Sequence, residues 1–199
     1  MAKLKVPVGP DDHAQGPADA PVTLLEYGDY ECSHCGHAYP IVRALQKKLG
    51  KQLRFVFRNF PLREIHPNAE VAAETAEFAA THGKFWDMHD LIFENQNSLS
   101  EQMHGELAHR LTLDRQALRD ALRSGTFAER VQGDFSSGVR SGVNGTPTIF
   151  YQQPAARWRL RTGDASPGDP ENDSQPQMNE MENVLPDHAN ILFDDPLSR

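Results

Sequence analysis

Cysteine is scarce in this sequence, with two residues among 199. A chain of this length can bury a substantial hydrophobic core, so its stability need not depend on crosslinks. The scarcity excludes a small domain held together by several disulfides. The two cysteines therefore point to chemistry rather than to structural support.

Positive charge and long apolar segments are also scarce. The chain has 20 Lys and Arg residues against 28 Asp and Glu residues, which gives a formal net charge of −8. No basic stripe offsets this balance, which argues against sequence-independent nucleic-acid binding. No stretch approaches the roughly eighteen apolar residues of a membrane span, and the first twenty residues hold no apolar leader segment. We expect a soluble, cytoplasmic protein with no membrane or nucleic-acid partner. Because the cytoplasm is reducing, a permanent disulfide is not expected, and redox catalysis or metal binding are the roles considered for the two cysteines.

A strand, a helix and a second strand are expected around the cysteines. Residues 22–28 form a short apolar run, typical of a buried strand. Apolar residues then recur at helical spacing over 36–49, and residues 53–61 alternate as a second strand. Cys32 thus falls at a strand-to-helix junction, near the helix N-terminus. Together these elements predict a parallel βαβ unit.

An all-helical block is expected next, over residues 67–140, where apolar residues recur three and four positions apart. His66 and Pro67 are interpreted as the start of a helix rather than as a binding site. The pattern predicts a solvated acidic face made of Glu70, Glu74 and Glu77. It also predicts that Phe85, Trp86 and Met88 pack inside the helical block. A turn-rich segment then leads into a strand at 148–151.

The segment Glu31 to Pro40, ECSHCGHAYP, contains both cysteines. A thiolate is the nucleophile in disulfide exchange, and a free thiol with a pKa near ~8.5 is mostly protonated at neutral pH. A helix N-terminus offers Cys32 unpaired amides and a positive dipole end, and His34 can add a donor or a positive charge. Cys32 is therefore the expected nucleophile. Cys35, one turn into the helix, is expected to be more buried and to resolve a mixed disulfide formed on Cys32.

The same segment also offers four zinc-ligand side chains: Cys32, His34, Cys35 and His37. Structural zinc sites usually combine two ligand pairs from separate elements, and the sequence has no second CxxC and no HxxxH. We therefore favour a redox pair and expect no metal. A zinc site or peptide-binding module without catalysis, and an inert surface pair, stay as alternatives.

Glu26 and Pro147 each allow two interpretations. Glu26 lies inside the first strand, where a buried carboxylate is costly and is usually protonated or used in proton transfer. It could instead face solvent at a strand edge. Pro147 could be a simple turn residue, or it could carry a cis peptide bond that lets the adjacent backbone meet a substrate.

The order of these features resembles the DsbA-like family of thioredoxin-fold thiol-disulfide oxidoreductases. The resemblance covers about Gly16 to Phe150 and rests on PVTLLEYGDYECSHCGHAYP and SGVNGTPTIF. It implies an α/β fold in which a thioredoxin-like sheet carries an inserted all-helical domain. It also implies exchange with protein or peptide thiols, an unidentified redox partner and no dissociable cofactor.

The resemblance implies a role for particular residues as well. Cys32 would be the exposed nucleophile, Cys35 the resolving thiol and Glu26 the buried acid near the pair. Thr146 and Pro147 would form a cis-proline loop that faces the cysteines and contacts the substrate. One departure is Ser33, which stands where many relatives have proline, at a position that tunes the redox potential.

The end of the chain departs from the family pattern, because residues 152–199 form an acidic, proline-rich tail without a core-forming period. Back-translating Tyr151 to Asp164 in a shifted frame gives INSQRHDGAYELET, which continues TPTIF as a strand, a turn and a helix start. We interpret the tail as the product of a reading-frame change and expect it to be disordered. The alternative is a genuine extension that folds back through VLPDHANILF. The expected segments are an arm (1–15), the first part of the thioredoxin-like domain (16–62), the helical insertion (63–140), the return to the sheet (141–151) and the tail (152–199).

Overall fold

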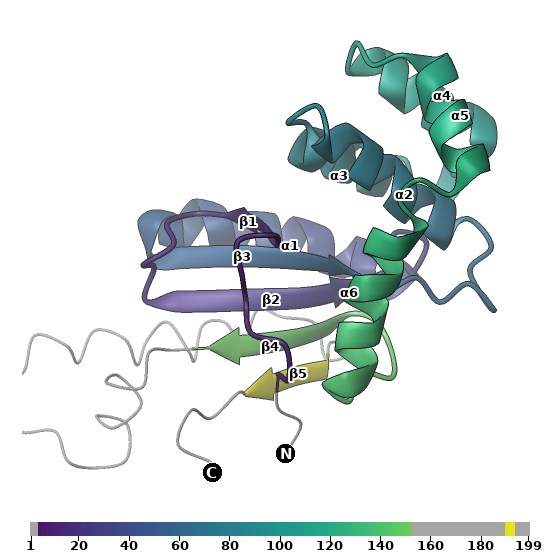
Figure 1. Ribbon diagram of the computed structural model, residues 1–199. Coiled ribbons are helices and arrows are strands. Elements are labelled where there is room, and N and C mark those ends of the chain that lie inside the picture. The colour runs from purple at the N-terminus through teal and green to yellow at the C-terminus, as the bar shows by residue number, and fades with distance from the viewer. Residues whose placement is uncertain (1–3, 153–189, 194–199) are drawn as a thin grey trace, which may run out of the picture.

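The computed structural model describes residues 4–152 and 190–193, and in them one mixed sheet forms the base of the fold (Figure 1). The parallel pair at its centre is β2 (Val22–Gly28) and β3 (Leu53–Asn59), joined through α1 (Ser33–Leu49) and the short η1 (Gly50–Gln52). This confirms the predicted βαβ unit. In the order β1-β3-β2-β4-β5, the flanking strands are β1 (His13–Gln15), β4 (Thr148–Gln152) and β5 (Asn190–Phe193).

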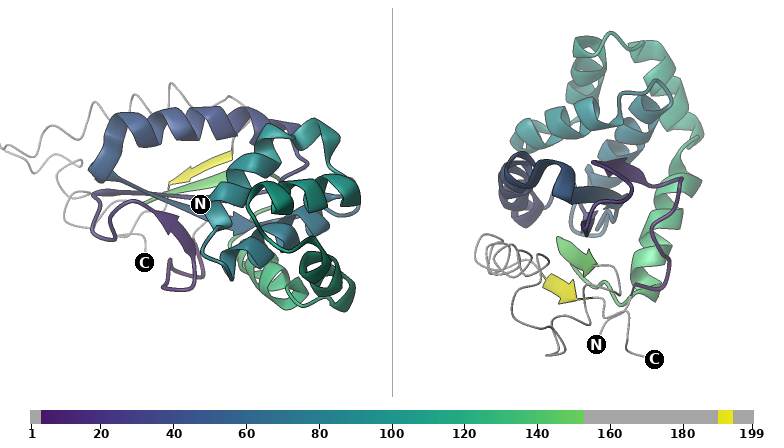
Figure 2. Two further views of the ribbon diagram at one scale, coloured as in Figure 1. Left: turned by 90° about the horizontal axis from the view of Figure 1, so that it is seen from above. Right: turned by 90° about the vertical axis from the view of Figure 1, so that its left-hand side faces the viewer.

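Different elements pack against the two faces of the sheet. On one face, α1 packs its buried side chains Val42 and Leu45 into the cluster that contains Leu24 and Phe55 of the sheet. On the other face, Leu25, Tyr27, Val56 and Phe150 pack with Leu4 of the N-terminal segment and with Phe135. Figure 2 shows α1 and the N-terminal segment on these opposite faces. Both faces are therefore buried, which is why the strands are almost continuously apolar.

The helical block lies beyond one end of the sheet (Figure 1). Its first two helices pack against each other, and its last helix, which contains Phe135, reaches back to β3. Side-chain N-caps begin two of the helices. The side chain of Ser100 accepts a hydrogen bond from Met103 N, and that of Asp114 accepts from Gln116 N and Ala117 N. The predicted all-helical insertion is thereby confirmed as α2 (Ala69–Ala80), α3 (Phe85–Glu94), η2 (Gln96–Ser98), α4 (Glu101–Arg110), α5 (Arg115–Ser124) and α6 (Ala128–Arg140).

The prediction of a solvated acidic face on α2 is wrong for Glu74 and Glu77, whereas the Glu70 side chain is 32% exposed. Glu77 is 4% exposed and Glu74 is 7% exposed. Glu77 accepts hydrogen bonds from Asn59 Nδ2 at 2.7 Å and pairs with His13 Nε2 at 3.0 Å. The acids are buried because α2 packs against other helices on two sides, and partners on β1 and β3 satisfy the Glu77 carboxylate. Phe85 and Met88, by contrast, are buried in the core as expected.

The N-terminal arm is more ordered than its irregular composition indicates. Residues 13–15 form β1 and pair antiparallel with β3. Arg58 is 3% exposed and donates to the Asp12 carboxylate at 2.7 and 2.9 Å, to Val6 O at 2.9 Å and to Pro7 O at 3.0 Å. One buried guanidinium, that of Arg58, therefore fixes the arm to the sheet. The alternation of apolar and polar residues along β3 could not indicate this role.

The proposed frame change would begin at Tyr151, which is described as part of β4, whereas most of the predicted disordered tail lies outside the described residues. Asn190–Phe193 is described, and its backbone pairs parallel with β4, with Ile191 opposite Ile149. These four residues belong to VLPDHANILF, the segment through which the alternative has the chain fold back. The strand is consistent with that alternative and leaves the origin of the tail as a prediction.

Candidate active site

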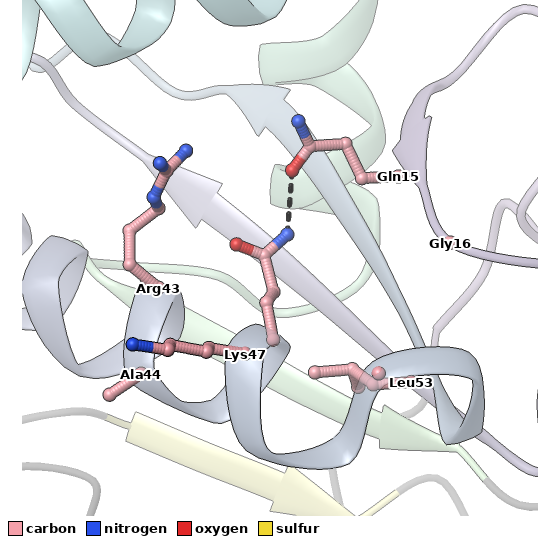
Figure 3. Close-up of a pocket in the computed structure, with 8 residues that line it drawn as sticks. Gln15, Gly16, Arg43, Ala44, Lys47 and Leu53 are labelled. Atoms are coloured by element: carbon pink, nitrogen blue, oxygen red, sulfur yellow. Dashed lines mark hydrogen bonds between the residues drawn. The ribbon is translucent and has the colours of Figure 1, made fainter.

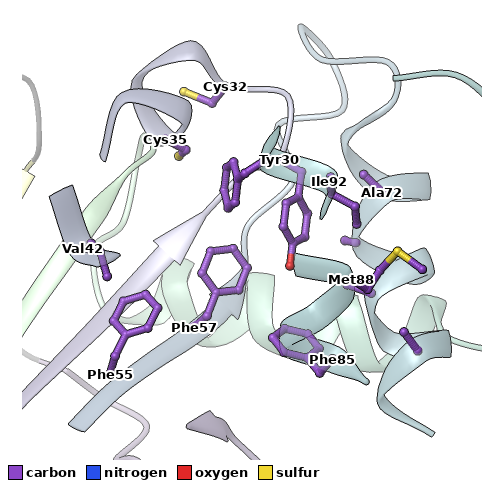
Figure 4. Packing of buried hydrophobic residues seen from close by; sticks show 14 of the residues in the cluster. Tyr30, Cys32, Cys35, Val42, Phe55, Phe57, Ala72, Phe85, Met88 and Ile92 are labelled. Carbon is purple, nitrogen blue, oxygen red and sulfur yellow. The ribbon is translucent and has the colours of Figure 1, made fainter. Parts of the chain in front are cut away.

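The two cysteines lie where β2 ends and α1 begins. Cys32 is the N-cap of α1, with extended backbone angles and no side-chain capping bond. Its carbonyl accepts the first helical bond from Gly36 N at 3.0 Å, and its amide donates to Asp29 O at 3.2 Å. A turn therefore places Cys32 at the helix N-terminus, as the sequence predicts. Figure 4 shows both thiols at the edge of the aromatic core formed by Tyr30 and Phe57.

Burial distinguishes the two thiols only slightly. Cys35 is fully buried, and Cys32 is 5% exposed. The expected order is observed, but the expectation of an openly exposed nucleophile is wrong. The reason is that Cys32 packs within the main core cluster instead of projecting from the helix end. Both cysteines are free thiols in this structure.

The environment of Cys32 lowers its pKa to about 5. The largest cause is a hydrogen bond from the Cys35 thiol, and further stabilisation comes from Thr146 and from the backbone amides of Cys35 and His34. Burial acts in the opposite direction and is outweighed. The His34 ring itself is exposed, so the contribution of His34 comes from its amide at the helix N-terminus.

The environment of Cys35 has the opposite effect. Burial raises the pKa of this thiol well above its ordinary value, and the hydrogen bond to Cys32 and the nearby charges of Glu26 and Cys32 raise it further. The amide of Asp29 acts against these effects, since it donates to Cys35 Sγ at 3.4 Å. At neutral pH the pair therefore holds one thiolate, on Cys32, and one proton, on Cys35.

Glu26 is the buried acid of the site. It is 3% exposed in the centre of β2, between Phe57 of β3 and Ile149 of β4. Burial raises the pKa of this carboxyl to about 8, and the charge of Cys32 adds to the effect. The interpretation of Glu26 as a solvent-facing edge residue is therefore excluded. Its carboxyl can take up and release a proton close to neutral pH.

The Thr146–Pro147 loop lies against Cys32. The peptide bond between these residues is cis, and Cys32 Sγ lies 3.3 Å from Thr146 O, to which it donates when it carries its proton. The Thr146 hydroxyl is buried without a hydrogen-bond partner in the described part of the chain. It lies close enough to Cys32 to contribute to the lowered pKa of that thiol. The loop thus presents both a carbonyl and a hydroxyl to Cys32.

Two residues that sequence reasoning missed also hold the site. Asp29, directly after β2, contacts both cysteines through its peptide group. Gln96 of η2 donates through Nε2 to Tyr30 O at 2.9 Å and to Cys32 O at 2.8 Å. A Cβ at Gly36 would lie 2.2 Å from Gln96 Oε1, so the glycine after the CxxC segment is what lets this amide approach. The helical insertion therefore contacts the carbonyl of Cys32.

Other kinds of site were sought in the described residues. No three His, Cys, Asp or Glu side chains of residues 4–152 come together in a way that could hold a metal ion. Among the helices of the same range, none combines the length and apolar character that a membrane crossing requires. A hollow of about 620 Å³ lies between α1 and β1, lined by Arg43, Lys47 and Gln15 among others (Figure 3). The cysteines do not line it.

Comparison with known proteins connects this geometry to a family. A thioredoxin family model matches residues 9–162. The Na⁺/H⁺ antiporter NhaA 1 of Salinispora arenicola is 46% identical over 148 residues, which are 74% of this chain and 22% of that protein. The chain thus spans less than a quarter of the length of this relative.

Two solved structures share the fold. BdbD from Bacillus subtilis, in its oxidised form, superposes with a TM-score of 0.66 at 24% identity, over 86% of this chain and 91% of that one. The alpha-DsbA1 protein of Wolbachia pipientis superposes with a TM-score of 0.67 at 18% identity, over 92% and 94% of the two chains. At these identities the structures establish a common architecture.

Proposed function

The chain belongs to the thioredoxin family, with a DsbA-like fold, and from this membership and the cysteine geometry we propose that it exchanges disulfides with protein or peptide thiols through Cys32 and Cys35. The observation that carries the proposal is the opposite perturbation of two adjoining thiols. The pKa of Cys32 falls to about 5, whereas that of Cys35 rises well above its ordinary value. One sulfur is ready to attack, and the other stays protonated until it is needed.

The reaction follows from this arrangement. The Cys32 thiolate attacks one sulfur of a substrate disulfide, forms a mixed disulfide and releases the other substrate sulfur as a thiolate. Cys35 then loses its proton, attacks Cys32 Sγ and releases the second substrate sulfur. The substrate disulfide has become two thiols, and the dithiol has become a disulfide. The reverse sequence oxidises a substrate dithiol.

Glu26 and the Thr146–Pro147 loop have supporting roles in this proposal. Glu26, when ionised, accepts the proton that Cys35 must lose, and its pKa of about 8 suits that transfer near neutral pH. The backbone of Thr146 and Pro147 lies beside the nucleophile, where an extended substrate segment would approach. The loop therefore serves as a substrate-binding element next to Cys32.

The test is reduction of a disulfide-bonded protein, insulin, by dithiothreitol with and without the protein. Wild type should accelerate the reaction, Cys32→Ser should be inactive, and Cys35→Ser should accumulate a mixed disulfide detectable by mass spectrometry. An unchanged rate with wild type, or full activity of Cys32→Ser, contradicts the proposal. Zinc that a chelator releases with concomitant unfolding would support a binding module instead.

The antiporter relatives do not change this proposal. The matched region makes up about a fifth of such a protein, and the thioredoxin family model accounts for it. We therefore ascribe disulfide exchange, not ion transport, to the region. The cytoplasmic location stays a prediction, which detection of the protein in fractionated cells would test.

A further inference from the structure

Asp29 has the most fully bonded carboxylate near the cysteines. Its side chain is completely buried. One oxygen, Oδ1, accepts from Glu31 N at 2.8 Å, and the other, Oδ2, accepts from Leu62 N and pairs with His66 Nδ1, both at 2.8 Å. The carboxylate therefore joins the segment before Cys32 to the loop that follows β3.

The peptide groups of Asp29 contact both reactive residues. Its amide donates to Cys35 Sγ at 3.4 Å, and its carbonyl accepts from Cys32 N at 3.2 Å. A side chain that is fixed at both oxygens also fixes the backbone to which it is attached. The loop at Leu62 and His66 can thus determine where the Asp29 amide points.

We propose that Asp29 is a positioning residue for the resolution step: its buried carboxylate, clamped by Leu62 N and His66, holds its own amide against Cys35 Sγ. This inference rests on the proposed disulfide exchange. The resolving sulfur must carry a negative charge when it attacks Cys32 Sγ, and it sits in a fully buried place. A backbone amide aimed at that sulfur stabilises the charge where water cannot.

The nucleophilic step depends less on this clamp. The Cys32 thiolate is stabilised by the Cys35 thiol, by Thr146 and by two helix amides, so the loss of one neighbouring contact changes it little. Cys35 has a raised pKa and depends on the Asp29 amide as a stabilising donor. A defect in Asp29 should therefore slow resolution more than attack.

The experiment uses the full chain and separates the two steps with 5,5′-dithiobis(2-nitrobenzoate). Attack by Cys32 releases one coloured thiolate, and resolution by Cys35 releases the second from the Cys32 mixed disulfide. Asp29→Asn keeps the shape of the side chain but leaves Glu31 N or Leu62 N without an acceptor. We expect the second phase to slow about tenfold, the effect of one lost hydrogen bond, and the first phase to change less than about twofold.

The matched control is Asp134→Asn. Asp134 is equally buried and accepts from a backbone amide, Asn59 N at 3.0 Å, and from the Arg130 guanidinium, but makes no hydrogen bond to either cysteine. It should leave both phases unchanged. A uniform slowing of both phases by Asp29→Asn, an equal effect of Asp134→Asn, or a second phase of normal rate would overturn the proposal.

A second variant covers the case in which Asp29→Asn does not fold. His66→Ala removes one donor from the clamp at a residue whose side chain is 21% exposed, and it should slow the second phase alone, by about threefold. A normal second phase in His66→Ala would then refute the clamp. The reagent is a small molecule, so the two phases can be measured even if the wild-type protein fails to reduce insulin. That failure would contradict the proposed function but not the positioning role of Asp29.

Discussion

The lowered pKa of Cys32 predicts that the relative stability of the reduced and oxidised forms reverses with pH. The pKa is about 5 in the folded protein and 9.0 in an unperturbed thiol. Because the folded value is the lower one, ionisation stabilises the reduced fold. The stabilisation is fully present above pH 9 and is lost as the pH falls from 9 to 5. The oxidised form has no such titration, since its sulfurs carry no proton.

The magnitudes place the reversal near neutral pH. At about 1.36 kcal/mol per unit, ionisation of Cys32 stabilises the reduced fold by about 2.7 kcal/mol at pH 7 and about 5 kcal/mol at pH 9. A disulfide across the four-residue segment stabilises the oxidised fold by roughly 1.9 kcal/mol through loop closure. The two effects balance at about pH 6.4. At pH 9 the reduced form should be more stable by about 3 kcal/mol, or roughly 6–12 °C in Tm.

The assay is thermal unfolding of both forms from pH 4 to pH 9, followed by circular dichroism, with the thiolate of Cys32 titrated by its ultraviolet absorbance. The difference in Tm between the two forms isolates the cysteines together with their coupling to Glu26, whose pKa the Cys32 charge raises only in the reduced form. Reduced Cys32→Ser should lose the added stability at pH 9. Two Tm curves that stay parallel across this range, or a thiolate that titrates near pH 8 to 9, would refute the reasoning.

Three further outcomes are expected. In the oxidised protein, where burial but not the Cys32 charge raises the pKa of Glu26, stability should fall between pH 4.5 and 7 by at most about 3 kcal/mol, and Glu26→Gln should abolish this fall in urea titrations at the two pH values. Thr146→Val removes a hydroxyl beside the thiolate and should raise the pKa of Cys32 by about one unit in the absorbance titration; an unchanged pKa contradicts that role. Arg58→Met leaves the Asp12 carboxylate buried without its partner and should cost about 3–5 kcal/mol in urea unfolding, which Arg58→Met with Asp12→Leu should largely restore.

The fold could be predicted where short-range patterns and burial agree. The apolar run of β2, the helical spacing of α1 and the helices of the insertion all depend on local periodicity, so the sequence indicates them directly. β1 has three residues and no period of its own, and it exists because β3 offers an edge for antiparallel pairing. β5 likewise pairs with β4 across a long separation in sequence, which no local pattern determines.

The residues of the site can likewise be divided into those that a local sequence pattern indicates and those that depend on distant contacts. Cys32 and Cys35 follow from a contiguous motif, and Glu26 follows from a charge within an apolar strand. The Asp29 side chain reaches Leu62 N, and the Gln96 side chain reaches Cys32 O, only when segments distant in sequence meet, so their residue types gave no signal. The burial of Glu77 has the same origin, because its partners lie on β1 and β3 and not on its own helix.

The same electrostatics gives the cysteine pair an intrinsic direction. Whatever stabilises the Cys32 thiolate stabilises the dithiol relative to the disulfide, because only the dithiol carries that charge. The gain of about 2.7 kcal/mol at pH 7 corresponds to a reduction potential about 60 mV higher than that of a pair with an unperturbed thiol. Burial of Cys35 does not cancel the gain, since that thiol is neutral at this pH whether or not its pKa is raised. We therefore expect the pair to accept electrons from substrate dithiols more readily than an unperturbed pair would. The net direction of exchange then depends on the redox partner that reoxidises or reduces the pair.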